Sequence, residues 1–305
     1  MRYNILSGTT ETVPAIGLGT WVLGGENWGG ANEEESVAVI REAVKQGMRL
    51  IDTAPFYGDG LAERLVGQAV RTMRDRVFIA TKCGVIRENG RFLKTLAPAS
   101  VIREADVSRT RLGMDVIDLY QCHWPDEKTP LEKTMEAMFK LQSLGRVRHI
   151  GVCNFGVDLL RAACSVAPVR TLQVPYSLLD RSIEEELLPF CIEKGIGVIV
   201  YGAMGGGILS GKYTSTPSFD KRDARRLFYK FYTGDKVATV NKSLGALRVM
   251  GRPLSQTALN WVRQQPGIMT VLAGCRTQEQ VRVNASAADW ELSVEEVGRI
   301  KGLGW

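Results

Sequence analysis

The sequence predicts a (β/α)8 barrel, formed by a single domain that covers residues 1–305. Two observations predict this fold. Short apolar runs rich in β-branched residues alternate with longer amphipathic runs from one end of the chain to the other, and no linker rich in Pro, Gly or Ser divides them. Strands that alternate with helices form parallel sheets, and eight such pairs can close into a barrel. A doubly wound open sheet usually has fewer strands.

The predicted strands and helices follow one another in pairs. The eight strands are short apolar runs that cover Ala15–Thr20, Met48–Thr53, Val77–Lys82, Val116–His123, Val147–Asn154, Thr171–Tyr176, Gly197–Tyr201 and Met269–Gly274. The eight helices are amphipathic runs that cover Glu33–Gln46, Leu61–Arg71, Pro98–Leu112, Leu131–Leu144, Val157–Ala167, Ile183–Glu193, Lys236–Val249 and Thr277–Ala287.

Three further segments lie outside this repeat. Arg2–Pro14, with Ser7-Gly8-Thr9 in its middle, predicts an N-terminal hairpin in front of the first barrel strand. Ser255–Gln264 and Ser293–Lys301 predict extra C-terminal helices outside the barrel.

Composition narrows the class of protein. With 45% hydrophobic and 24% charged residues, the chain is close to the soluble globular average, which excludes disordered and fibrous proteins. No apolar stretch is long enough for a membrane span, and the polar opening of the chain lacks a signal-peptide core. The six cysteines form no CxxC pair, so we expect reduced thiols in a cytoplasmic protein. Two histidines without a Cys/His cluster predict no metal site, and the net charge of +6 leaves an anionic partner open.

Polar or titratable side chains stand at the ends of seven of the eight predicted strands. Active sites of barrels of this kind lie at the carboxyl ends of the strands. A polar residue there can also simply cap the next helix, and for Asn154 alone that is the simpler interpretation. The residues at these ends are Trp21, Asp52, Lys82, His123, Asn154, Gln173 with Tyr176, Tyr201, and Arg276 after Gly274-Cys275.

Three of these residues, together with nearby Tyr57, suggest proton transfer to a carbonyl oxygen. Tyr57 follows Asp52 by one short turn, and a phenol is a weak acid near neutral pH unless a cation lies beside it. Lys82 can supply that cation, Asp52 can hold the ammonium, and His123 can donate a hydrogen bond across the barrel mouth. Taken singly, Asp52 and Lys82 could be a structural ion pair and Tyr57 a loop anchor. Together the four residues favour protonation of an alkoxide while a hydride reaches carbon.

The motifs around these residues, in their order and spacing, resemble those of the aldo-keto reductase family over nearly the whole chain. They are Asp52-Thr53-Ala54-x-x-Tyr57-Gly58, Ile79-Ala80-Thr81-Lys82, Leu112-Gly113-x-Asp115-x-Ile117-Asp118-Leu119-Tyr120-x-x-His123, Gly151-Val152-Cys153-Asn154-Phe155, Gln173-Val174-x-Tyr176 and Gly274-x-Arg276-Thr277-x-x-Gln280-x-x-x-Asn284. The resemblance implies a reductase or dehydrogenase that uses NADP(H). It also implies that Tyr57 is the general acid/base, that Lys82 lowers its pKa, that Asp52 orients Lys82 and that His123 positions the carbonyl.

The resemblance further implies how the cofactor is bound. Gly17-Leu18-Gly19 lacks the third glycine of a Rossmann fingerprint, and Tyr213 replaces the Ser or Thr of a P-loop, so neither of those folds applies. Tyr201 would stack on the nicotinamide, Asn154 and Gln173 would hold its carboxamide, and Arg276 would bind the 2′-phosphate of NADP(H). The full set of expected cofactor residues is Trp21, Asn154, Gln173, Tyr201, Gly205, Gly207, Gly211, Lys212, Gly274, Arg276, Gln280 and Asn284. Cys153 departs from the family, which usually has Ser at this position.

Aromatic residues near the strand ends predict the substrate class. Flat aromatic walls suit sugars and cyclic polyols as well as small aldehydes and ketones, and the Trp21–Gly30 segment resembles the bacterial branch of the family that handles sugars and inositol. The expected substrate-binding residues are Trp21, Trp28, Phe56 and Trp124. The basic and aromatic segment Phe219–Tyr232 can bind nucleic acid in principle, but we interpret it as an insertion that folds over an anionic cofactor.

Two other functions remain open at this point. One is a redox-sensing subunit that binds NADP(H) while docked on a partner protein. The other is a sugar isomerase or aldolase on the same barrel, in which Lys82 forms a Schiff base, although this would leave Arg276 and the cofactor motifs unexplained. The sequence marks no interface, so it predicts no oligomeric state, and it does not give the direction of the reaction in the cell.

Overall fold

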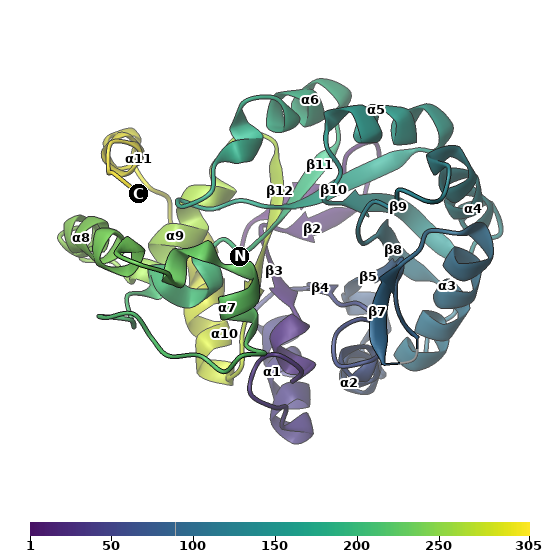
Figure 1. The fold of residues 1–305 in the computed structure, drawn as a ribbon, viewed down its shortest axis with the longest axis horizontal. Coiled ribbons are helices and arrows are strands. Elements are labelled where there is room, and N and C mark those ends of the chain that lie inside the picture. The colour runs from purple at the N-terminus through teal and green to yellow at the C-terminus, as the bar shows by residue number, and fades with distance from the viewer. Residues whose placement is uncertain (89) are drawn as a thin grey trace.

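Eight parallel strands close into a barrel in the computed structural model, which describes residues 1–88 and 90–305 (Figure 1). The strands are β3 (Ile16–Gly19), β4 (Leu50–Asp52), β5 (Phe78–Cys83), β8 (Ile117–Cys122), β9 (Val147–Cys153), β10 (Val169–Pro175), β11 (Gly197–Tyr201) and β12 (Ile268–Gly274). Each strand pairs with the next barrel strand along the chain, and β12 pairs with β3 to close the ring. The predicted (β/α)8 barrel is therefore confirmed, with all eight of its strands.

Eight helices surround the barrel, and local sequence signals set their ends. Asn32 caps the first helix by accepting a hydrogen bond from the amide of Glu35, and Gly113 ends the third in the left-handed conformation at φ 64°. The helices are α1 (Glu33–Lys45), α2 (Leu61–Val70), α3 (Pro98–Leu112), α4 (Leu131–Ser143), α5 (Val157–Val166), α6 (Leu187–Lys194), α9 (Leu254–Arg263) and α10 (Gln278–Ala285).

The prediction for the helix of the seventh strand–helix pair is wrong: the predicted segment is helical, but a different helix packs beside the barrel. The helix α9 was predicted to lie outside the repeat, but it packs on β12, whereas α8 (Lys236–Arg248) packs on the outer side of α9 (Figure 1). The pattern was misleading because both helices bury an apolar face, and such a face does not show which of the two packs on the barrel. The predicted extra helix at the C-terminal end is present as α11 (Val294–Lys301), at the margin of the fold.

The core has two layers. The larger layer lies between the strands and the surrounding helices, and the smaller one fills the barrel interior. Side chains along a strand alternate between these layers, because successive residues point to opposite faces of a sheet. The interior layer consists of Leu6, Val13, Leu50, Phe78, Ala80, Leu119, Ile199, Met269 and Leu272.

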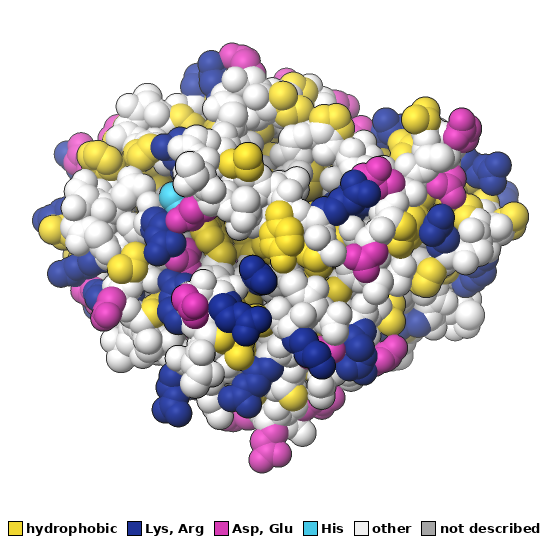
Figure 2. All heavy atoms as spheres, turned by 180° about the vertical axis from the view of Figure 1, so that it is seen from behind, with side chains coloured by type: hydrophobic (Ala, Val, Ile, Leu, Met, Phe, Trp, Pro, Cys, Tyr) yellow, Lys and Arg dark blue, Asp and Glu magenta, His cyan; other side chains and the backbone are white. Residues whose placement is uncertain are grey.

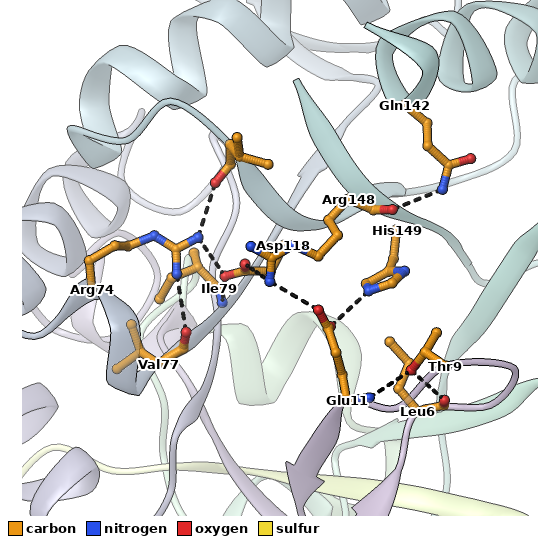
Figure 3. Close-up of polar contacts among 11 residues, drawn as sticks. Leu6, Thr9, Glu11, Arg74, Val77, Ile79, Asp118, Gln142, Arg148 and His149 are labelled. Carbon is orange, nitrogen blue, oxygen red and sulfur yellow. Dashed lines mark hydrogen bonds and ion pairs between the residues drawn. The ribbon is translucent and has the colours of Figure 1, made fainter. Parts of the chain in front are cut away.

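The N-terminal hairpin closes the end of the barrel at which the strands begin. Its strands, β1 (Tyr3–Ile5) and β2 (Thr12–Pro14), pair antiparallel as predicted, and fully buried Leu6 and Val13 enter the barrel interior. Ionic contacts hold the hairpin in place: Glu11 accepts hydrogen bonds from Arg148 and pairs with His149 of β9 (Figure 3). The opposite end, where the strands terminate, is here called the mouth.

Asp118 of β8 is the second carboxylate of this cluster (Figure 3). It is 1% exposed, accepts a hydrogen bond from the Ile79 amide at 2.7 Å, and pairs with Arg74 at 2.8 Å and Arg148 at 3.2 Å.

The surface seen from behind carries Lys and Arg side chains mixed with Asp and Glu (Figure 2).

Two segments cover the mouth. The antiparallel hairpin of β6 (Val85–Glu88) and β7 (Arg91–Lys94) was not predicted. The second segment, Phe219–Tyr232, here called the strap, contains the short helix α7 (Ala224–Phe228). Within the described part of the chain, the helices are too short or too polar to cross a membrane.

Candidate active site

The four predicted catalytic residues lie together at the mouth. The Lys82 ammonium donates hydrogen bonds to Asp52 Oδ1 at 2.5 Å, to the Tyr57 hydroxyl at 3.1 Å and to the carbonyl of Thr53 at 3.0 Å. The ring of His123 stands edge-on to that of Tyr57, with 6.0 Å between their centroids. A continuous chain of hydrogen bonds therefore links the Asp52 carboxylate to the phenol through Lys82.

The alternation of strand side chains explains why these residues meet. Asp52 follows interior Leu50 by two residues, and Lys82 follows interior Ala80 by two residues. Since residues two apart share a face, both polar side chains point into the barrel, one layer closer to the mouth. The register of β4 with β5 places Asp52 opposite Ala80, so Lys82 begins two residues closer to the mouth and its side chain reaches the Asp52 carboxylate.

Lys82 is fully buried and remains an ammonium. Burial by itself lowers the pKa of a lysine, but the carboxylate of Asp52 and the neighbouring Tyr57 and Cys153 together raise the pKa of Lys82 above its ordinary value. A lysine that forms a Schiff base needs a free amine. This environment therefore argues against the isomerase or aldolase reading.

Tyr57 is held in its protonated form. Burial raises the pKa of Tyr57 to about 12, and the lowering by Lys82, which the family resemblance implies, offsets only part of that effect. The phenol of Tyr57 therefore keeps its proton at neutral pH and accepts a hydrogen bond from the ammonium of Lys82.

His123 is the second group that can face a carbonyl oxygen. Burial, together with the positive charges of Lys82 and Lys94, holds the pKa of His123 well below its usual range. A neutral imidazole results, which can donate one hydrogen bond without carrying charge. Asn154 fixes the backbone at this point, because its side-chain amide donates to the His123 carbonyl at 3.0 Å.

Gln121 is a site residue that the sequence analysis missed. Its amide donates to Asp52 Oδ2 at 3.3 Å, and Gln173 donates to the same oxygen at 2.8 Å. The oxygen of Gln121 also accepts hydrogen bonds from Gln173 at 3.4 Å and from the thiol of Cys153 at 3.7 Å. Its position in the sequence could have revealed it. Gln121 follows interior Leu119 by two residues, and a polar side chain buried in a strand needs a hydrogen-bond partner.

The expected nicotinamide-binding residues also meet at the mouth. The hydroxyl of Tyr201, two residues after interior Ile199, donates to Asn154 Oδ1 at 2.9 Å. Asn154 has a φ of 61°, a conformation that L residues other than Asn and Asp rarely adopt. The amide of Gln173 lies beside this pair but is used by Asp52 and Gln121.

The glycine-rich loop after β11 packs closely against the strap. Gly206 has a φ of 67°, and a Cβ added there would lie 2.9 Å from the ring of Tyr229 in the strap. Tyr232 of the strap donates to the Gly206 carbonyl at 3.0 Å. Close packing of strap on loop therefore requires glycine, and it leaves the exposed Lys212 beside Gly207.

The strap also contacts the loop after β3. The amide of Ala224 donates to the carbonyl of Asn27 at 2.8 Å, and the ring of Phe228 lies 5.3 Å from that of Trp21. The strap therefore bridges the loops that follow the first and the seventh barrel strands, which are separated in the barrel only by β12, and it lies along that side of the mouth. The interpretation of Phe219–Tyr232 as an insertion that folds over an anionic cofactor stays a prediction.

Arg276 lies at the end of β12 beside the same loop. Its guanidinium donates to the carbonyl of Trp28 at 2.7 Å and to that of Gly30 at 3.4 Å. Gln280 and Asn284, which were also expected to bind the adenosine end of the cofactor, contact the residues that follow β12. Gln280 accepts a hydrogen bond from the Arg276 amide at 2.8 Å, and Asn284 contacts the thiol of Cys275 at 3.3 Å.

The predicted substrate residues line the mouth in two groups. Trp21 stacks on Tyr57 with 6.0 Å between centroids and contacts the edge of Trp28 at 5.4 Å. Phe56 lies 6.1 Å from His123, and Trp124 lies beneath the ammonium of Lys94. Two further aromatic rings, which sequence reasoning did not assign to the substrate, complete the wall: Phe92, at 4.6 Å from Phe56, and Phe228.

No group of three His, Cys, Asp or Glu side chains within residues 1–88 and 90–305 is arranged to hold a metal ion.

Comparison with known proteins places this chain in a family. The model of the aldo/keto reductase family matches residues 15–304. The chain is 37% identical to the aldo-keto reductase YhdN of Bacillus subtilis (strain 168), over 97% of this chain and 91% of that protein. It is 34% identical to the NADH-specific methylglyoxal reductase of Escherichia coli (strain K12), over 94% and 93% of the two chains.

A solved structure agrees with these relatives. The glycerol dehydrogenase AKR11B4 from Gluconobacter oxydans superimposes with a TM-score of 0.91 at 32% identity, over 99% of this chain and 94% of that one. The family match covers the barrel from its first strand to its last helix. The chain thus belongs to the aldo-keto reductase family and is an NAD(P)-dependent oxidoreductase.

Proposed function

We propose that this protein transfers a hydride between NADP(H) and the carbonyl or alcohol carbon of a sugar, a cyclic polyol or a small aldehyde or ketone, with Tyr57 as general acid/base. The observation that carries the proposal is the chain of hydrogen bonds from Asp52 through Lys82 to the Tyr57 hydroxyl. This chain joins the buried phenol of Tyr57 to the positive charge of the Lys82 ammonium at the centre of the mouth.

The residues of the site divide the work of carbonyl reduction. A bound nicotinamide supplies the hydride that reaches the carbonyl carbon. Tyr57 and His123 donate hydrogen bonds to the carbonyl oxygen, and Tyr57 gives its proton to the alkoxide as it forms. Lys82 stabilises the resulting tyrosinate by its charge and hydrogen bond. In the oxidation of an alcohol, the same groups act in reverse, with tyrosinate as the base.

The residues at the mouth suit a dinucleotide. Tyr201 and Asn154 form a platform for the nicotinamide, and exposed Lys212, beside Gly207 of the glycine-rich loop, brings a positive charge for the pyrophosphate. The buried indole nitrogen of Trp28 has no hydrogen-bond partner within the described chain, so a polar group of a ligand can satisfy it.

Arg276 supports the choice of NADP(H). Two of its five N–H donors reach backbone carbonyls, so others remain for the 2′-phosphate. Gln280 and Asn284 would hold the adenosine end. The relative from Escherichia coli is named as NADH-specific, which makes this preference a matter for direct measurement.

The aromatic walls support the proposed substrates, since flat rings pack on the apolar faces of sugars and polyols. Trp21, Trp28, Phe56 and Trp124 provide these faces on both sides of Tyr57 and His123. We keep a cytoplasmic location as part of the proposal, on the basis of the cysteine pattern of the sequence.

Titration of the tryptophan fluorescence with NADPH and, separately, with NADH tests the cofactor. We expect saturable quenching by both, with tighter binding of NADPH. A screen of aldehydes, ketones and sugars then follows NADPH oxidation by absorbance. If neither nucleotide binds, or if Tyr57→Phe reduces substrates as fast as the parent enzyme, the proposal is wrong.

A further inference from the structure

We propose that Lys94 binds an anionic group on the substrate, so that the preferred substrates are aldehydes or ketones that also carry a negative charge, such as a carboxylate. This inference rests on the proposed function, because it names the substrate class of the same site.

The β6–β7 hairpin presents one of its faces to the mouth. Phe92 and Lys94 are two residues apart on β7 and therefore share a face. Phe92 packs against Phe56, with 4.6 Å between ring centroids, and the Lys94 ammonium lies 4.6 Å from the ring centroid of Trp124. Both Phe56 and Trp124 are residues of the substrate wall, so the ammonium stands at the edge of the space beside His123.

The charged groups around Lys94 leave its ammonium available to bind an anion. Arg87 is the other cation on this face, opposite Phe92 in the register, and it is neutralised by an ion pair with Glu26 at 2.5 Å. Within the described residues, Lys94 has no carboxylate at ion-pair distance. The carboxylate of Asp52 is not available to Lys94, because it is buried, pairs with Lys82 and accepts hydrogen bonds from Gln121 and Gln173.

The surroundings of His123 agree with an anion at this place. The charges that act on His123 are those of Lys82 and Lys94, and both are positive. Lys82 has its own counterion in Asp52, whereas the charge of Lys94 is open to solvent at the rim. An anionic group on the substrate would supply the missing counterion and would orient the carbonyl toward Tyr57 and His123.

A purely structural role for Lys94 is the competing explanation, since an ammonium over an indole ring can stabilise the hairpin alone. The two explanations differ in what they predict for matched substrates. A structural role affects charged and neutral substrates equally, whereas an anion-binding role affects only the charged ones.

The experiment uses the full-length enzyme with NADPH and two pairs of benzaldehydes, 3- and 4-carboxybenzaldehyde and their methyl esters. The readout is the ratio of kcat/KM for the acid to that for its ester, taken for the better of the two isomers. We expect a ratio above one for the parent enzyme. Lys94→Gln should lower it about tenfold, as for the loss of a charge-assisted hydrogen bond, and Lys94→Glu should lower it further. Lys94→Arg should retain it.

Arg91→Gln is the matched control. Arg91 lies on the same strand but on the opposite face, so its loss removes one positive charge without changing the mouth. We expect the ratio to stay unchanged in this variant. An unchanged ratio in Lys94→Gln, or an equal fall in Arg91→Gln, would overturn the inference about Lys94. If the parent enzyme reduces none of the aldehydes and binds neither NADPH nor NADH, the proposed function itself fails, which is a separate result.

Discussion

Gln121 and Gln173 donate to the same oxygen of Asp52, at 3.3 and 2.8 Å, and so leave its other oxygen to Lys82. The two amides come from strands that are not neighbours in the barrel, β8 and β10. They fix the plane of the carboxylate, which in turn fixes the direction of the Lys82 ammonium toward Tyr57. A change at either glutamine should therefore alter proton transfer without touching the substrate.

Gln121→Met keeps the length of the side chain but removes its donor and its acceptor. We expect kcat to fall about tenfold, because Asp52 retains only one of its two amide donors, with little change in the KM for the carbonyl substrate. Steady-state kinetics at saturating cofactor measure this split. Cys153→Ser is the control, since a hydroxyl still donates to the oxygen of Gln121; its activity should stay within about twofold of the parent enzyme.

Tyr57→Phe removes only the proton donor. We expect the affinity for NADPH in the fluorescence titration to remain, while kcat falls by about 10²–10⁴-fold, the usual contribution of a positioned acid. Weaker cofactor binding in this variant would mean that the phenol holds the ligand, and its role in the reaction would then need revision.

The pH dependence should differ between the two directions of the reaction. Burial raises the pKa of Tyr57 to about 12, so the phenol keeps its proton throughout the neutral range. Reduction needs this protonated form and should stay level between about pH 6 and 9. Oxidation needs the tyrosinate and should rise with pH across that range.

His123 should add no step to either profile. Burial and the charges of Lys82 and Lys94 hold its pKa well below the usual range, so we expect no titration of the imidazole in the neutral range. Initial rates in both directions, from pH 6 to 9 in buffers of constant ionic strength, measure these profiles. A reduction rate that halves between pH 7 and 8 would contradict the assignment of Tyr57 as a strongly buried acid.

Arg276→Ala should separate the two nucleotides. We expect binding of NADPH to weaken by about ten- to a hundredfold and binding of NADH by much less, because only NADPH carries the 2′-phosphate. The guanidinium also holds the carbonyls of Trp28 and Gly30, and the NADH arm of the titration measures this structural share. Equal losses for the two nucleotides would show that Arg276 does not recognise the phosphate.

The cluster beneath the barrel gives a prediction about stability. Asp118→Asn removes a buried carboxylate, which accepts a hydrogen bond from the Ile79 amide and forms ion pairs with Arg74 and Arg148. We expect the free energy of unfolding to fall by about 2 kcal/mol, since the partly exposed arginines regain water. Asp106→Asn is the matched control, because Asp106 is 46% exposed and its pairs with Arg109 and Arg146 should contribute less than about 1 kcal/mol. Chemical denaturation of both variants measures the difference.

Residues at strand ends could be predicted from the sequence, because the strand pattern itself places them at one end of the barrel. Asp52, Lys82 and Tyr201 each follow an interior apolar residue by two positions. Gln121 obeys the same rule and could have been predicted by counting from Leu119. The β6–β7 hairpin also had a local signal, the dipeptide Asn89-Gly90, which favours a tight turn.

Other features had no local signal. The contact of Phe228 with Trp21 joins segments about two hundred residues apart, and only the closed barrel brings them together. The exchanged positions of α8 and α9 have a similar cause. An amphipathic pattern predicts that a helix buries one face, but it does not say which neighbouring surface receives that face.

The pairing of β3 with β12 has a consequence for synthesis of the chain. Ile16 lies opposite Val271, so the first strand of the barrel acquires one of its two neighbours only when the last strand has emerged from the ribosome. Until then the growing protein exposes two unpaired sheet edges, which are prone to associate with other chains. Contacts of such long sequence separation slow folding. Production of this enzyme should therefore respond more strongly to the rate of translation and to chaperone supply than its ordinary composition suggests.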